Sequence, residues 1–133
     1  MDCHGPPSSW SSARCGDGMG STPVGAQAVS ALIWSPFGSI QEAKVVARIL
    51  LEEELIACAN FIEGVHSIYR WQGEIGEGDE CGALLKTHRS LLKDAIARLE
   101  KLHPYDSPAI VGWNCDEAGV ATGPWLSSLA RAD

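Results

Sequence analysis

The sequence has 133 residues, of which 45% are hydrophobic and 20% charged, a composition typical of one soluble globular domain. Its 10 basic and 17 acidic side chains give a formal net charge of -7. This charge disfavours nucleic acid and anionic membranes as partners, because both bind clustered Lys and Arg. No run of about 18 apolar residues occurs, so no membrane-spanning helix is predicted. The five cysteines are irregularly spaced, which favours a reducing compartment and therefore a cytoplasmic location.

The composition changes near residue 28. Residues 1–28 hold five Gly, three Pro and five Ser and show neither a signal-peptide core nor an Arg-rich transit pattern. Such a segment buries too little apolar surface to offset the entropy of ordering. We therefore expect a flexible tail over residues 1–28, followed by one folded domain over residues 29–133.

The first regular elements are expected directly after this tail. An apolar run at residues 28–34 predicts a strand, closed by a turn at residues 35–38. Ser39 and Glu42 form a capping-box pattern that predicts the start of a helix. Apolar side chains then recur at helical spacing as far as about residue 54.

A long hairpin is expected in the middle of the chain. Residues 57–71 are rich in β-forming residues and contain no Pro, which predicts one strand with a bulge at Gly64. The glycine-rich, acidic residues 72–80 are expected to form the connecting loop, and residues 81–87 the return strand. At about 3.3 Å per residue the first strand is near 50 Å long, so its far end is expected to pair outside the domain.

The remaining elements complete a recognisable order. A second helix is predicted with Ser90 as its cap, ending near residue 102 because Pro104 stops it. Residues 109–115 predict a fourth strand and residues 125–129 a short terminal helix. The order β-α-β-β-α-β predicts an α+β, ferredoxin-like sandwich with an additional C-terminal helix. Both main helices then cover one sheet face, and part of the other face is expected to meet another subunit.

Four segments, in order along the chain, resemble motifs of the CutA family of divalent-cation tolerance proteins. They read LIACAN (55–60), SIYRWQG (67–73), LLKT (84–87) and LHPYDSP (102–108). The resemblance implies a compact homotrimer with the architecture of the PII signalling proteins, in which long hairpins pair across subunits. It also implies the binding and tolerance of divalent cations, with copper as the expected ion, and no enzymatic reaction.

Two residues of these motifs are candidate metal ligands. Cys58 offers a thiolate that suits copper, although cysteine is more often a small buried hydrophobic residue. His103 offers an imidazole that suits copper or zinc, and it also lies where a helix C-terminus favours histidine as a dipole partner. Some family members place a Cys near the end of the first strand and a second His before the His-Pro-Tyr motif. The corresponding positions here are residues 33–35 and Leu102.

Tyr69, Trp71, Lys86 and Tyr105 form a second candidate set. Tyr69 and Trp71 point to one face of the predicted strand, and Lys86 lies on its partner strand. Aromatic rings with one ammonium group suit an anionic small molecule, and they equally suit packing between subunits. The alternative function is therefore a PII-like regulator that binds a small anionic metabolite at clefts between subunits.

No catalytic arrangement is evident in the sequence. It contains neither GxxxxGK[ST] nor GxGxxG, and no Ser-His-Asp, Cys-His or paired-carboxylate set stands in register. A small acylphosphatase shares the predicted layout, but it needs an arginine on a Gly-rich first turn, where this chain has Ser-Pro-Phe-Gly. We expect a binding protein and not an enzyme.

Overall fold

The protein is described here by a computed structural model over residues 29–130, so the predicted tail at residues 1–28 lies outside the described residues. In chain order the elements are β1 (Ser30–Phe37), α3 (Ile40–Glu52), β2 (Cys58–Trp71), β3 (Glu74–His88), the 3-10 helix η1 (Arg89–Leu91), α4 (Leu92–Leu102), β4 (Val111–Asn114) and α5 (Thr122–Ala130). The strands form one antiparallel sheet in the order β2-β3-β1-β4. The predicted α+β order with a C-terminal helix is confirmed.

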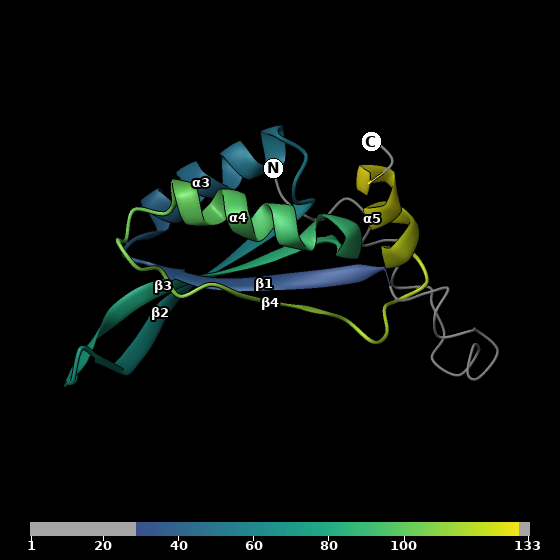
Figure 1. Cartoon of the computed structure of the whole chain (residues 1–133). Helices are drawn as coiled ribbons and strands as arrows, with labels where there is room; N and C mark the ends of the chain where they lie inside the picture. Colours follow the sequence, from purple (N-terminus) through teal and green to yellow (C-terminus); the bar gives the residue numbers. More distant parts are fainter. Residues whose placement is uncertain (1–28, 131–133) are drawn as a thin grey trace.

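The helices lie on one side of the sheet. α3 and α4 run along this side, and α5 stands beside the start of β1 (Figure 1). No described helix covers the opposite side, and none between residues 29 and 130 is long and apolar enough to cross a membrane. The β2–β3 hairpin extends beyond the two-layer body.

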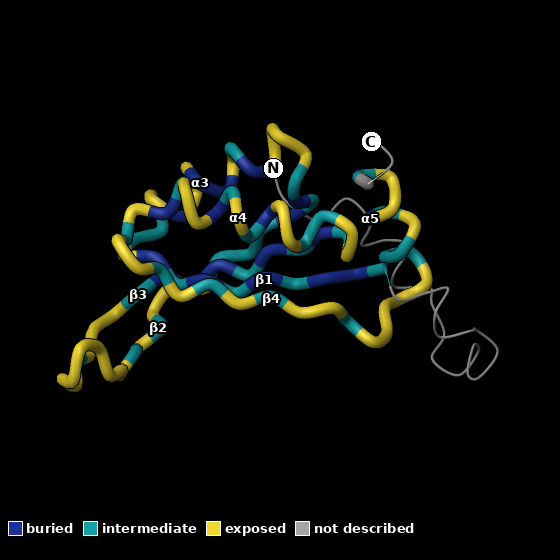
Figure 2. Tube along the Cα trace, viewed as in Figure 1, coloured by how far each residue is buried: buried dark blue, intermediate teal, exposed yellow. Residues whose placement is uncertain are grey.

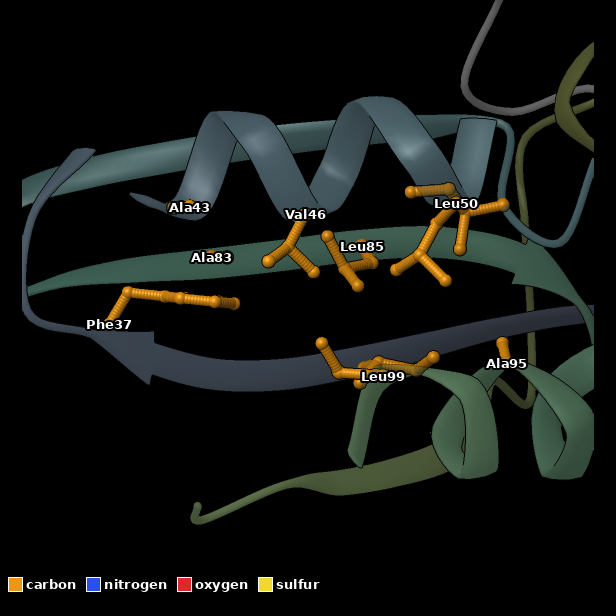
Figure 3. Close-up of a cluster of buried hydrophobic side chains, with 10 residues drawn as sticks. Phe37, Ala43, Val46, Leu50, Ala83, Leu85, Ala95 and Leu99 are labelled. Atoms are coloured by element: carbon orange, nitrogen blue, oxygen red, sulfur yellow. The ribbon is translucent and has the colours of Figure 1, made fainter. Parts of the chain in front are cut away.

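The core lies between the sheet and the two long helices (Figure 3). Odd-numbered residues of β1, and of β3 from Cys81 onward, are buried because successive strand side chains alternate between the two faces. Helical spacing brings the apolar face of α3 and that of α4 onto them. The cluster contains Ile33, Phe37, Ala43, Val46, Leu50, Ile56, Ala83, Leu85, Ala95 and Leu99.

The predicted cap of α3 is present, whereas the predicted cap of α4 is wrong. The Ser39 hydroxyl oxygen accepts the Glu42 backbone N–H at 3.2 Å, which satisfies a donor that the first helical turn leaves open. Before α4, the His88 ring accepts the Ser90 backbone N–H at 3.0 Å. His88 therefore begins a 3-10 turn, and Ser90 lies inside it. An imidazole nitrogen can replace the usual cap oxygen because it too is an acceptor.

The first strand continues through the turn that was predicted after it. β1 runs to Phe37, with Pro36 opposite Gly82 of β3. On the other side of β1, pairing with β4 ends at the Trp34–Val111 pair, two residues before Pro36. Proline lacks a backbone donor, but it is tolerated where a strand has become an edge.

The hairpin connection is shorter than predicted. Residues 74–80 belong to β3, and only Gln72 and Gly73 connect the strands, between the paired residues Trp71 and Glu74. Gln72 and Gly73 have φ values of 52° and 81°, as a two-residue hairpin turn requires. The predicted bulge is confirmed, because the register shifts between Ile62 and Val65. Most of the hairpin beyond this bulge is exposed (Figure 2).

The sheet face opposite the helices is apolar. It is formed by even-numbered residues of β1 and β3 and their register partners on β2 and β4. Ile62, Val111 and Trp113 on this face are 48%, 56% and 44% exposed. We call this surface the open sheet face. The residues that contribute to it are Leu32, Trp34, Pro36, Leu84, Lys86, Asn60, Ile62, Val111 and Trp113.

Candidate functional site

His103 is held at the end of α4 by bonds from both ring nitrogens to the backbone. Nε2 lies 2.9 Å from the Pro36 carbonyl oxygen, and Nδ1 accepts the Tyr105 backbone N–H at 3.1 Å. A carbonyl only accepts, so the proton of the neutral ring is on Nε2. The ring is buried and stacks on Phe37 with the centroids 4.1 Å apart. This burial lowers the pKa of His103.

Tyr105 extends this contact to the root of the hairpin. Its hydroxyl donates to the Glu80 carboxylate at 2.8 Å, and its ring is tilted against that of His103 with the centroids 4.7 Å apart. Burial, followed by the Glu80 bond, raises the pKa of Tyr105, so the phenol keeps its proton. Sequence reasoning selected Tyr105 but missed Glu80, since no local pattern joins residues that are 25 positions apart.

The two predicted metal ligands are not brought together within one chain. Cys58 begins β2 opposite Lys86 of β3, whereas His103 stacks on Phe37, which lies opposite Cys81. Lys86 and Cys81 are five residues apart on β3, or about 16 Å. Between residues 29 and 130, no three His, Cys, Asp or Glu side chains form a group able to hold a metal ion. Within the described part of the chain, Cys58 and His103 therefore do not belong to one group of metal donors.

The aromatic and lysine set is likewise spread along the hairpin. Tyr69 lies opposite Gly76 and Trp71 opposite Glu74, and both rings are about half exposed. The Tyr69 ring packs over Gly76, where an added Cβ would lie 2.8 Å from it. Lys86 is ten residues further along β3, or about 33 Å from Gly76. One chain therefore does not form a pocket from Tyr69, Trp71 and Lys86.

A small acidic cleft lies where the hairpin leaves the body. Its volume is about 200 Å³, and it is lined by residues 38–41 at the start of α3 and by Glu63, Gly64 and residues 79–81. Asp79 is bound to the ring of His66 at 2.5 Å, and Glu80 is bound to Tyr105. The cleft therefore joins the hairpin root to the first turn of α3.

Together, these features define a small ferredoxin-like α+β subunit with a projecting hairpin and an apolar sheet face that no described helix covers. Its motif residues His103 and Tyr105 connect the body to the hairpin through hydrogen bonds. Comparison with known proteins identifies the family to which this subunit belongs.

Residues 31–128 match the family model described as "CutA1 divalent ion tolerance protein". Two similar relatives are named divalent-cation tolerance protein CutA. That of Pyrococcus horikoshii is 39% identical over 71% of this chain and 92% of its own length. That of Thermotoga maritima is 43% identical over 71% of this chain and 93% of its own length.

Solved structures of the same family share the fold. CutA1 from Ehrlichia chaffeensis is 33% identical, with a TM-score of 0.71 over 76% of this chain and 94% of its own. CutA1 from Pyrococcus horikoshii is 36% identical, with a TM-score of 0.69 over 74% of this chain and 96% of its own. The chain belongs to the CutA family, whose members are divalent-cation tolerance proteins rather than enzymes.

Proposed function

We propose that this protein acts as a homotrimer that binds divalent cations, copper foremost, in divalent-ion tolerance. The observation that carries the proposal is the open sheet face. Ile62 on β2 and Val111 and Trp113 on β4 are exposed apolar side chains at the two edges of this face, and exposed apolar surfaces mark interaction sites in soluble proteins. A closed symmetric oligomer covers the same face on every subunit.

We assign the cation to sites that become complete only when the subunits assemble. Between residues 29 and 130 one chain keeps Cys58 and His103 apart and forms no group of three donors, so we assign the further donors to a neighbouring subunit. Thiolate and imidazole are the donors that copper favours. A cation at His103 must displace either the Pro36 carbonyl, 2.9 Å from Nε2, or the Tyr105 backbone N–H, 3.1 Å from Nδ1. The acidic charge of the chain also concentrates cations around it.

Calorimetric titration combined with analytical ultracentrifugation tests this proposal. The wild-type protein, His103→Gln and Cys58→Ser are titrated with Cu²⁺ and Zn²⁺, with His66→Gln as the control because His66 is an exposed histidine on the hairpin. We expect a trimer that prefers Cu²⁺, and weaker binding in the first two variants only. A monomeric wild type would contradict the trimer, and unchanged binding in both variants would contradict the assigned ligands.

A second candidate function is the binding of a small anionic metabolite between subunits. It is favoured by the exposed rings of Tyr69 and Trp71 and by Lys86 on a face that assembly covers. Tyr105 lies at the hairpin root, where such a cleft would begin. The same calorimeter, loaded with small phosphorylated and carboxylated anions, tests it: heat lost in Lys86→Met and Tyr69→Ala supports this function, and the absence of heat in the wild type excludes it.

We also place the protein in the cytoplasm. The five cysteines are irregularly spaced, which favours a reducing compartment, and within residues 29–130 Cys81 and Cys115 are free. Burial raises the pKa of both thiols, so they remain protonated and weakly reactive near neutral pH.

A further inference from the structure

Lys86 carries the cationic side chain of the open sheet face. It lies on the inner strand β3, level with the start of β2, with Leu32 beside it on β1 and Cys58 beside it on β2. Among residues 29–130, the other side chains on this face between the sheet ends are apolar or neutral. A surface that covers Lys86 removes water from its ammonium group, and this is strongly unfavourable unless a carboxylate replaces the water.

The projecting hairpin carries the acids that can meet this need. Four acidic residues lie between positions 74 and 80. Asp79 is bound to His66 and Glu80 to Tyr105, which leaves Glu74 and Glu77 as the candidates.

The pleat of the hairpin separates Glu74 from Glu77. Glu74 lies opposite Trp71, on the face that also carries Tyr69. Glu77 lies on the other face, which it shares with Arg70. Glu74 is therefore the carboxylate that accompanies the exposed aromatic rings and has no cation on its own face of the hairpin.

We infer that Lys86 of one subunit forms an ion pair with Glu74 of a neighbouring copy, when the aromatic face of that copy's hairpin docks on the open sheet face. Exposed apolar side chains on both surfaces and their opposite charges make the two surfaces complementary. Lys86 and Glu74 are twelve residues apart on β3, about 40 Å, so the pair forms only between copies. The inference rests on the proposed trimer and specifies which contact determines its register.

Charge reversal tests the pair. Sedimentation equilibrium measures the concentration at which half of the protein is assembled, for the wild type, Lys86→Glu, Glu74→Lys and the double variant Lys86→Glu/Glu74→Lys. We expect each single reversal to raise this concentration about tenfold or more, since like charges then face each other. The double variant is expected to return to within about threefold of the wild type because it restores an opposite-charge pair at every interface. The control Lys86→Glu/Glu77→Lys is expected to behave like Lys86→Glu.

Each outcome decides between the inference and the proposed function. A wild type that stays monomeric contradicts the trimer itself. An assembled wild type with no recovery in the double variant, or with recovery in the Glu77 control, overturns the Lys86–Glu74 pair and leaves the trimer standing. Lys86→Met, measured with circular dichroism to confirm folding, gives a check without charge reversal. It is expected to weaken assembly by leaving Glu74 unpaired, and tighter assembly would also overturn the pair.

Discussion

At the scale of single residues, the state of His103 follows from its surroundings. Both nitrogens bond to the backbone of residues that other elements supply, and the ring is buried against Phe37. Burial favours the neutral ring, while the Pro36 carbonyl, Glu42 and Glu80 oppose this effect; burial is the larger, so the pKa of His103 is lowered.

This lowered pKa predicts a loss of stability in mild acid. The unfolded ring has a pKa of about 6.5, so below that pH the unfolded state binds more protons than the folded state and the free energy of unfolding decreases. The decrease continues as pH falls through the folded pKa. We expect His103→Gln, which does not titrate, to lose less stability between pH 7.5 and 5.5 than the wild type. At pH 7.5 the variant is expected to be about 1–3 kcal/mol less stable, because it loses the stack on Phe37.

Urea unfolding of both proteins at several pH values and one fixed protein concentration measures this difference. A fixed concentration is needed because assembly contributes to apparent stability. Parallel pH profiles for the two proteins would show that His103 is not the titrating group.

At the scale of elements, the hairpin depends on one backbone position at its root. Gly64 has a φ of 77° and lies within the bulge between the paired residues Ile62 and Val65. A side chain in this left-handed conformation is strained even where space is free, and no atom lies within 4 Å of the position that a Cβ would take.

Gly64→Ala is expected to destabilise the protein through this strain alone. We expect the free energy of unfolding to fall by about 1 kcal/mol, the usual cost of the left-handed conformation for alanine. Gly78→Ala is the matched control, because Gly78 lies on the same hairpin with equally free space and no positive φ. Thermal or urea unfolding of both variants measures the effect, and equal losses in the two would contradict the strain argument.

At the scale of the whole molecule, the helices cover only one of the two sheet faces (Figure 1). Trp113 of β4 lies on the open sheet face opposite Leu32 and outside the core cluster. The side chain is therefore available for contact between subunits and is not needed for the core.

Trp113→Lys is expected to separate the subunits without unfolding them. A charge placed on an apolar interface must be desolvated on assembly, so we expect the half-assembly concentration to rise about a hundredfold. Val45→Lys makes a similar change on the exposed side of α3, where Val45 is 62% exposed, and is expected to leave assembly unchanged. Sedimentation equilibrium compares the two variants, and an unaffected Trp113→Lys would remove the open sheet face from the interface.

The amino-acid sequence alone determined the order of the elements, the Ser39 cap and the bulge at Gly64. These features depend on side-chain spacing and on backbone preferences of residues close together in the chain. It did not identify Gln72 and Gly73 as the turn, because the glycines and acids between residues 73 and 80 also resemble a loop.

Only the tertiary structure decided the state of the candidate site. The His103 ring bonds to a carbonyl 67 positions away, and the Tyr105 hydroxyl bonds to Glu80, 25 positions away. Strand register separates Cys58 from His103, although both lie in motifs that the sequence made visible. Desolvation and hydrogen bonding depend on which distant residues the fold brings together. Patterns among residues close in the chain do not indicate these long-range contacts.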